Sequence, residues 1–255
     1  MICWLSKIPR RIGFSTSALP QLFTHVVYYE KGNHEINRNL SLLRPLGITY
    51  SGNESPTLYA SQNDKDVVNA FLANQAANFP NPHDSLVAVA PGSVWNTKRW
   101  PKEHFERLVR MLMDDGLSIV LIGGRDDLAL CSDIRNALGG RVVNAAGMLT
   151  LLQSAELIQR CVVLVSNDSA PMHLAAGVGT PVVAIFGATA PQFGFAPRGA
   201  NDFVVEMHGL SCRPCAIHGG EKCPIKTFVC MKDLKPELVY TKVKMVVDRT
   251  KSEAQ

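Results

Sequence analysis

The sequence predicts an α/β fold with a parallel sheet, and three features of the chain support that prediction. Apolar stretches of strand length alternate with amphipathic stretches of helix length from Leu86 onward. The predicted strands are apolar at successive residues, as in sheets that carry helices on both faces. Turns with glycine and hydroxyl residues follow these strands, at the edge where parallel sheets bind ligands. We therefore expect a ligand-binding α/β domain in the later part of the chain.

The first part of the chain is less regular. A short strand is expected at Ile12–Phe14. A helix is expected at residues 33–46, where apolar residues recur at helical spacing, and another at 64–77, with Asp64 as its N-cap. Prolines and turn-forming residues in 78–84 cannot continue a helix, so this stretch is expected to be a linker.

The later part of the chain carries a regular series of elements. Strands are expected at residues 86–90, 117–122, 142–143, 162–166 and 181–186. Helices are expected at residues 101–115, 126–138, 151–160 and 170–177, and a further helix at the C-terminal end. The first of these helices has a proline in its opening turn and places Phe105, Leu108 and Leu112 on one face.

Composition excludes several classes of protein. Hydrophobic residues make up 46% of the 255 residues and charged residues 19%, which is typical of a globular protein. The net charge of +4 comes without a basic stripe interleaved with aromatic residues, so no nucleic-acid partner is expected. No apolar run reaches the roughly 18 residues of a transmembrane helix, and the start lacks the features of a secretory signal. A cytoplasmic protein is expected, with the inner-membrane surface as a further location.

The turn after the first strand of the later part contains two cations. Gly92 and Ser93 are expected to form a tight turn, which Thr97, Lys98 and Arg99 follow at the ligand-facing edge. Cations beside a helix start suit a diphosphate group, although this turn taken alone is more typical of solvated loop charges.

The turn after the next strand contains glycines followed by two acids. Asp126 can accept hydrogen bonds from a ribose, or it can serve only as the N-cap of the helix that follows. In the turn after the third strand, Thr150 is expected to be the N-cap of a helix. Asp126 is therefore a candidate site residue with a structural alternative.

The turn after the fourth strand carries the strongest signal. Asp168 is followed by a helix start at Ser169 or Ala170, whose free amide groups carry the positive end of the helix dipole. His173 follows within the first helical turns. The turn after the fifth strand adds Gly187 and Thr189 at the same edge. An isolated capping acid or histidine is commonly structural, but five such turns on one sheet edge indicate a ligand site.

Four segments together resemble a known family. The sequence resembles glycosyltransferase family 9, the enzymes that build the inner core of lipopolysaccharide, and within it the ADP-heptose-dependent heptosyltransferase II type. The segments that carry the resemblance are Pro91-Gly-Ser with Trp95, Lys98-Arg-Trp-Pro, Asn167-Asp-Ser-Ala-Pro-Met-His-Leu-Ala-Ala and Ile185-Phe-Gly-Ala-Thr-Ala-Pro. No Gly-x-Gly-x-x-Gly follows the first strand of the series, so a nucleotide-dependent dehydrogenase is disfavoured.

The resemblance implies the GT-B architecture, in which two Rossmann-like domains face each other. Residues 1–80 would form part of the acceptor-side domain and the linker. Residues 81–255 would form the nucleotide-sugar donor-binding domain, with a cysteine-rich loop and a C-terminal helix.

The resemblance also implies roles for the site residues. Lys98 would contact the donor phosphate and Asp168 the heptose hydroxyls, and both are catalytic candidates. The amides near Ser169 and Ala170, with His173, would bind the diphosphate. Further residues expected to bind the donor are Ser93, Thr97, Asp126, Gly187 and Thr189. Catalysis would need no metal cofactor, and the partners would be ADP-heptose and the lipid A–core acceptor at the membrane surface.

One departure from the family concerns the beginning of the chain. The family's first domain opens with a strand and a glycine-rich turn that carries the proposed general base, an aspartate. No such turn precedes Ile8. We therefore expect an N-terminally truncated chain that lacks the general base, binds ADP weakly and transfers little sugar. The alternatives are a non-catalytic nucleotide-binding fragment and a GT-B transferase that uses another nucleotide-sugar.

Four of the seven cysteines cluster in the sequence, at Cys212, Cys215, Cys223 and Cys230. In a cytosolic protein this grouping is compatible with a structural zinc site, because four thiolates suit tetrahedral zinc. Reduced free thiols, a disulfide and an iron–sulfur cluster are the alternatives. A catalytic role is not expected for these cysteines.

Overall fold

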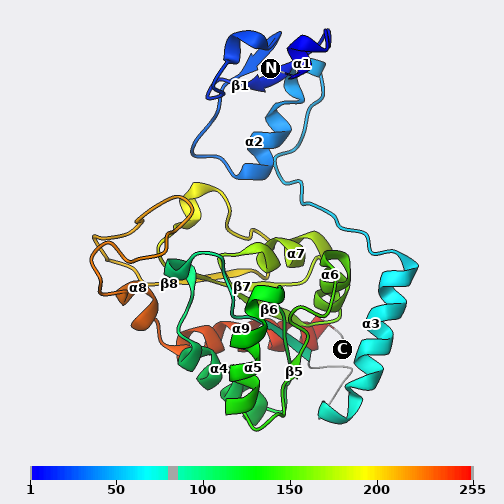
Figure 1. Ribbon diagram of the computed structural model, residues 1–255, viewed down its shortest axis with the longest axis vertical. Coiled ribbons are helices and arrows are strands. Elements are labelled where there is room, and N and C mark those ends of the chain that lie inside the picture. The colour runs from blue at the N-terminus through cyan, green and yellow to red at the C-terminus, as the bar shows by residue number, and fades with distance from the viewer. Residues whose placement is uncertain (1, 80–85, 254–255) are drawn as a thin grey trace. The chain divides into compact units, whose positions relative to one another are not determined.

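The computed structural model describes residues 2–79 and 86–253. These residues form two compact units (Figure 1). The first consists of Met1–Pro56 with Pro191–Ala196, and the second of Thr57–Ala190 with Pro197–Gln255. Residues 80–84 of the expected linker lie outside the described residues. Within the described part of the chain, none of the helices combines the length and apolarity that a membrane span requires.

The first unit contains a short parallel strand pair. Strands β1 (Ile12–Phe14) and β2 (His25–Val27) pair in parallel, so the expected strand is confirmed and a second one is added. A short helix α1 (Ile2–Leu5) and a 3-10 turn, η1 (Pro20–Leu22), complete this part.

The helix expected at 33–46 is shorter in the structure. Helix α2 spans Glu35–Ser41, and a 3-10 turn, η2, follows at Arg44–Leu46. The Nδ1 atom of His34 accepts a hydrogen bond from the Ile36 amide and thereby caps the start of α2. Pro45 has no amide hydrogen, and its ring clashes with the carbonyl four residues earlier, so a regular helix cannot run through it.

Hydrogen bonds to α2 explain why Pro191–Ala196 belongs to the first unit. The Arg38 guanidinium, which is buried, donates to the Phe193 carbonyl at 2.9 Å, and the Glu35 amide donates to the Gly194 carbonyl at 2.8 Å. His34 Nε2 lies 3.0 Å from the Ala196 carbonyl oxygen. A segment far away in the sequence is therefore part of this small unit.

The second unit is built on a parallel sheet, as the sequence predicts. Its strands lie in the order β5-β4-β3-β6-β7-β8, and every neighbouring pair is parallel. The strands are β3 (Leu86–Ala90), β4 (Ser118–Leu121), β5 (Val143–Asn144), β6 (Val163–Asn167), β7 (Val182–Phe186) and β8 (Phe203–Glu206). The strand order reverses between β3 and β6, which makes the carboxyl ends of these strands the place where a doubly wound sheet binds ligands.

Helices cover both faces of this sheet (Figure 1). On one face α4 contacts α5 and α9, and on the other α6 contacts α3 and α7. The helices are α3 (Gln62–Asn74), α4 (Lys102–Asp114), α5 (Leu128–Ala137), α6 (Leu151–Gln159), α7 (Ala170–Val178), α8 (Val229–Lys232) and α9 (Pro236–Glu253). Three 3-10 turns, η3 (Ala76–Asn78), η4 (Asn96–Lys98) and η5 (Arg125–Asp127), occur in the connections of this unit, and η6 (Pro191–Phe193) belongs to the first unit.

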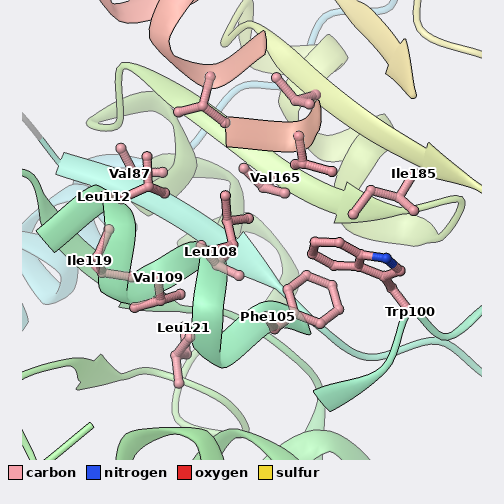
Figure 2. Close-up of a cluster of buried hydrophobic side chains, with 14 of the residues drawn as sticks. Val87, Trp100, Phe105, Leu108, Val109, Leu112, Ile119, Leu121, Val165 and Ile185 are labelled. Atoms are coloured by element: carbon pink, nitrogen blue, oxygen red, sulfur yellow. The ribbon is translucent and has the colours of Figure 1, made fainter. Parts of the chain in front are cut away.

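The largest cluster of buried hydrophobic side chains lies between the sheet and the helices α4, α5 and α9. Phe105, Leu108 and Leu112 of α4 are fully buried, which confirms the apolar face predicted for that helix. Figure 2 shows the Trp100 ring beside Phe105 and Ile185. The indole N–H of Trp100 donates to the Leu234 carbonyl at 2.9 Å, so its one polar atom is satisfied inside the core.

Two predicted helix starts need correction. The N-cap of α3 is Ser61 and not Asp64, which instead occupies the third helical position and completes a capping box with Ser61. The α-helix expected at 126–138 begins at Leu128, after η5. Asp126 is not its N-cap, and Asp127 accepts the hydrogen bond from the Gly124 amide at 2.9 Å. The predicted cap of α6 is confirmed, because Thr150 accepts from the Gln153 amide.

Candidate functional site

The candidate site lies at the carboxyl ends of β3 and β6. These strands are neighbours in the sheet although about 70 residues separate them in the chain, and the strand order reverses between them. The turn after β3 carries Lys98, and the turn after β6 carries Asp168. The parallel pairing thus brings two sequence-predicted residues to one edge.

Lys98 and Asp168 form an ion pair. The Lys98 Nζ atom lies 2.8 Å from Asp168 Oδ2 and donates to the Asp168 main-chain carbonyl at 3.1 Å. Only 14% of the Lys98 side chain and 8% of the Asp168 side chain are exposed. At this burial each charge depends on the other, because an unpaired charge would lose most of its hydration.

Thr189 contacts the same carboxylate. Its hydroxyl donates to Asp168 Oδ2 at 2.7 Å, and its side chain is buried. Gly187, two residues earlier, is also buried, and a Cβ atom there would lie 2.6 Å from Met231 Cε. The turn after β7 therefore packs closely against α8 and presents one hydroxyl to Asp168.

Thr97 and Ser93 have mainly structural contacts. The Thr97 hydroxyl accepts from the Gly220 amide at 2.8 Å, and the Thr97 amide donates to the Gly220 carbonyl at 2.9 Å. The Ser93 carbonyl accepts from Arg99 Nε at 2.6 Å, and Ser93 is buried. These contacts shape the loop that carries Lys98.

The start of α7 lies beside Asp168. Ser169 is the N-cap, and its hydroxyl lies 3.3 Å from the Asn167 carbonyl, to which it donates, and from Ser166 Oγ. Ala170 and His173 are exposed on this helix. Pro171 has no amide hydrogen and the Met172 amide donates to the Ser169 carbonyl at 3.1 Å, so the amides that this helix start offers to an anion are those of Ser169 and Ala170.

The two acids after β4 differ in their surroundings. Asp126 is exposed on η5. Asp127 bonds to the Gly124 amide, and a Cβ atom on Gly92 would overlap its carboxylate. Asp127 therefore packs against the turn after β3, while Asp126 is accessible.

Asn167 is a residue whose contribution the sequence did not reveal. Its Oδ1 accepts from the Trp100 amide at 3.1 Å, and its Nδ2 donates to the Pro91 carbonyl at 2.8 Å and to the Gly92 carbonyl at 3.3 Å. It joins the ends of β3 and β6 beneath the ion pair. Its signals in the sequence were an amide at the end of an otherwise apolar strand and its place in a segment that resembles glycosyltransferase family 9.

The zinc site, one of the alternatives that the sequence left open for the four clustered cysteines, is not supported by the structure. Across residues 2–79 and 86–253, no group of three or more His, Cys, Asp or Glu side chains is arranged to hold a metal ion. Two of the thiols bond to main-chain groups: Cys215 Sγ donates to the Cys212 carbonyl at 3.1 Å, and Cys223 Sγ accepts from the Phe228 amide at 3.4 Å. All seven cysteines are free thiols.

The loop that carries these cysteines touches the candidate site. We call the segment between β8 and α8, residues 207–228, the cysteine loop. Gly220 of this loop bonds to Thr97, and the Cys215 amide donates to the Ala188 carbonyl at 2.8 Å. The cysteine loop therefore bridges the turns that carry Lys98 and Thr189, which its position after the sheet strands did not suggest.

Comparison with known proteins gives a consistent result. Residues 1–223 match the model of glycosyltransferase family 9 (heptosyltransferase). Lipooligosaccharide heptosyltransferase 2 of Haemophilus influenzae is 36% identical over 113 residues, which are 42% of this chain and 33% of that protein. Lipopolysaccharide heptosyltransferase 2 of Escherichia coli K12 is 27% identical over 202 residues, or 76% of this chain and 58% of that protein. The matches thus span less than two thirds of the length of these curated relatives.

A solved structure shows the same fold. The structure of the E. coli ADP-heptose LPS heptosyltransferase II superposes with a TM-score of 0.75 at 24% identity, covering 98% of this chain and 73% of that one. At this identity the likeness establishes the fold, which is that of the GT-B heptosyltransferases, and the roles of the site residues rest on the geometry above.

Proposed function

Because the chain belongs to glycosyltransferase family 9, we propose that it takes part in transferring a heptose from ADP-heptose to the inner core of lipopolysaccharide. The observation that carries the proposal is the ion pair of Lys98 and Asp168, 2.8 Å apart where the strand order reverses. The second compact unit would be the donor-binding domain, and residues before it would contribute to the acceptor side. The reaction would take place at the cytoplasmic face of the membrane that holds the lipid acceptor.

The ADP part of the donor would lie between Lys98 and the start of α7. The lysine supplies a positive charge, and the start of α7 supplies the Ser169 and Ala170 amides and the positive end of the helix dipole. Both would interact more strongly with the diphosphate as it gains charge on leaving, which lowers the barrier. With these groups the diphosphate would be neutralised without a divalent cation.

The sugar part would lie against Asp168. Both side-chain contacts that Asp168 makes among the described residues use Oδ2, so Oδ1 would accept hydrogen bonds from the heptose hydroxyls. An acceptor hydroxyl oxygen would form a bond to the anomeric carbon while the bond from that carbon to the ADP oxygen breaks. ADP would leave with the electron pair, the configuration would invert, and the acceptor hydroxyl proton would pass to a base.

Asp126 is the proposed partner of the ribose. It follows β4, the strand next to β3, where Rossmann-like domains commonly place an acid that accepts from a ribose hydroxyl. It is exposed, whereas Asp127 is engaged with Gly124 and the turn after β3. Changing Asp126→Asn should therefore weaken ADP binding more than it weakens the binding of inorganic diphosphate.

Titration calorimetry with ADP tests the proposal. We expect the wild-type chain to bind ADP and Lys98→Met to bind it about 10- to 100-fold more weakly, the effect of removing a charge-assisted hydrogen bond. Lys102→Met is the matched control, since Lys102 lies on α4 and pairs with Glu106 and Asp133 instead. Equal ADP affinity of all three proteins would refute the assignment of Lys98.

A competition experiment tests the identity of the donor. ADP-heptose should displace bound ADP at lower concentrations than UDP- or GDP-sugars do, because the turns beside Asp126 would bind the adenine base specifically. The ribose, the proposed partner of Asp126, is common to all these donors. Preferential displacement by a UDP- or GDP-sugar would instead indicate a GT-B transferase with a different donor. Displacement by none of them, with ADP still bound, would favour a nucleotide-binding fragment without transferase activity.

A further inference from the structure

The turn after β7 is held by the cysteine loop at three consecutive carbonyl groups. Arg213 Nε donates to the Gly187 carbonyl at 2.5 Å, the Cys215 amide to the Ala188 carbonyl at 2.8 Å, and Arg213 Nη2 to the Thr189 carbonyl at 2.8 Å. Two residues of one loop thus fix the main chain of a turn that lies about 25 residues earlier in the sequence. The Thr189 side chain of that turn then reaches Asp168.

The guanidinium of Arg213 is itself fixed. Its Nη1 donates to the Met207 carbonyl at 2.6 Å, and its Nη2 lies 2.7 Å from Glu206 Oε2 at the end of β8. Only 8% of the Arg213 side chain is exposed. A planar fork with several N–H donors can serve these acceptors together, whereas the ammonium group of a lysine is a single point. The Glu206 carboxylate offsets the buried positive charge.

The position of Thr189 matters because one carboxylate oxygen serves two partners. Asp168 Oδ2 accepts from Thr189 Oγ1 at 2.7 Å and pairs with Lys98 Nζ at 2.8 Å. A hydroxyl hydrogen bond of this length is lost when the donor moves by about 1 Å. If the Thr189 turn were free to shift, the carboxylate of Asp168 could rotate toward Lys98 and change the direction of its other oxygen.

We propose that Arg213 is a positioning residue of the donor site: it fixes the turn of residues 187–189 so that Thr189 holds the Asp168 carboxylate in the orientation that receives the sugar. The proposal rests on the proposed function, in which Asp168 binds the heptose. Arg213 acts through Thr189 and touches neither Lys98 nor Asp168. The cysteine loop is thereby a functional part of the site.

The test compares the affinities of ADP-heptose and ADP in four proteins: wild type, Arg213→Lys, Thr189→Val and the double variant. Arg213→Lys keeps the charge beside Glu206 but loses the fork. We expect it to weaken ADP-heptose binding about tenfold and ADP binding less than about threefold. The lost hydrogen bonds of Arg213 would alter the orientation of Asp168, which contacts the sugar and not the ADP part. A general loss of structure would weaken both ligands alike.

The double variant shows whether Arg213 acts through Thr189. In the Thr189→Val background, Arg213→Lys should cause less than about a twofold further loss, because the hydroxyl that Arg213 positions is already absent. Arg135→Lys is the matched control, since Arg135 Nε donates to the Val142 carbonyl at 3.1 Å away from the site. It should leave the ratio of the two affinities unchanged. An unchanged ratio in Arg213→Lys, or multiplicative effects in the double variant, would overturn the proposal.

A measurement without ligand separates this proposal from the proposed function. If the wild-type chain binds neither ADP nor ADP-heptose, the proposed function fails, and amide hydrogen exchange still tests Arg213. Amides in the peptide that covers 187–190 should exchange about tenfold faster in Arg213→Lys than in wild type, and not in Arg135→Lys. Equal exchange in Arg213→Lys and wild type would overturn the positioning role even if donor binding is observed.

Discussion

Asp168 and Lys98 form a pair whose members depend on each other. Their charged atoms are 2.8 Å apart and their side chains are 8% and 14% exposed. Removing two charges from water costs several kcal/mol for each, and the mutual attraction offsets this only while both are present. Thr189 adds one hydroxyl donor to the same carboxylate. A substitution of Lys98, Asp168 or Thr189 is expected to change the position and the energy of the other two side chains.

Stability measurements should reveal this dependence. Lys98→Met should lower the free energy of unfolding by about 2 kcal/mol, because the Asp168 carboxylate remains charged without its partner. This loss is smaller than for a fully buried pair, since both side chains are partly exposed. In the double variant Lys98→Met/Asp168→Asn the loss should be smaller, since no buried charge is left without a partner. Urea unfolding measures both values. A double variant less stable than Lys98→Met would contradict the expected dependence.

Asn167 should contribute to stability more than its size suggests. Its side chain bonds to the Trp100 amide and to the Pro91 and Gly92 carbonyls, all of which are buried. Asn167→Ala leaves these main-chain groups without a partner, so we expect a loss of about 3 kcal/mol in the free energy of unfolding. Exposed Asn136 on α5 is the control, and Asn136→Ala should change the value by less than about 0.5 kcal/mol. Similar losses in both variants would disprove the linking role of Asn167.

At the scale of elements, the cysteine loop joins turns that the sheet holds apart. It bonds to Thr97 on one side and to the carbonyls of residues 187–189 on the other. Its thiols lie in different surroundings. Burial raises the pKa of Cys215, and the nearby thiols of Cys212 and Cys223 raise it further. Burial also raises the pKa of Cys223. Hydrogen bonds from main-chain amides, that of Phe228 first, lower this pKa by more, so it lies below its ordinary value.

Alkylation should therefore distinguish the cysteines. Cys223 should react with iodoacetamide before Cys215 and Cys230, because a thiolate is the reactive form and burial raises the pKa of Cys230 to about 11. As pH rises, the labelling rate of Cys223 should level off at a lower pH than that of Cys215. Peptide mass spectrometry at a series of pH values measures these rates.

The deeply buried cysteines provide the internal control for that experiment. Burial raises the pKa of Cys131 to about 12, and burial raises that of Cys161 as well. Both should remain unlabelled in the native protein and react after unfolding in urea. Labelling of Cys215 ahead of Cys223 would show that the amide hydrogen bonds do not stabilise the Cys223 thiolate.

At the scale of the whole molecule, the hydrophobic core belongs to the second unit. The buried core cluster extends from Val87 to Val247, and every member lies in that unit. Among residues 2–56 no hydrophobic side chain is buried. A stretch of about 55 residues with so little buried apolar surface is marginal as an independent fold. The stability of the chain should therefore come from the second unit.

A shortened chain tests this expectation. A protein that begins at Thr57 should unfold in a single urea transition, with a free energy of unfolding within about 1 kcal/mol of the full chain, because it keeps the whole core cluster. It should also bind ADP as tightly as the full chain, since Lys98, Asp168 and the start of α7 are all present. Loss of the cooperative transition, or much weaker ADP binding, would contradict the independence of this unit.

The sequence by itself determined most of the strands and helices of the second unit, with the exceptions of β8 and α8, and the residues that follow its strands at the carboxyl edge of the sheet. Strand β3 spans the predicted residues because a strand buried on both faces must be apolar throughout. The helix starts were harder, since Ser61 and Asp64, or Asp126 and Asp127, are equally suitable caps until the backbone direction is known. Local pattern thus identifies elements better than it identifies their ends.

Only the tertiary structure decided which of these residues meet. Lys98 and Asp168 are 70 positions apart and pair because β3 and β6 are neighbours in the sheet. Arg213 reaches the turn of Thr189 because the cysteine loop folds back over the carboxyl ends of the strands. The four cysteines whose spacing had suggested metal ligands lie near one another, but among the described residues no three of them are arranged to hold a metal ion. The type and spacing of side chains indicate which chemical groups each turn carries. The distances between these groups in space depend on the strand order and on the path of the loops, which short-range sequence patterns do not determine.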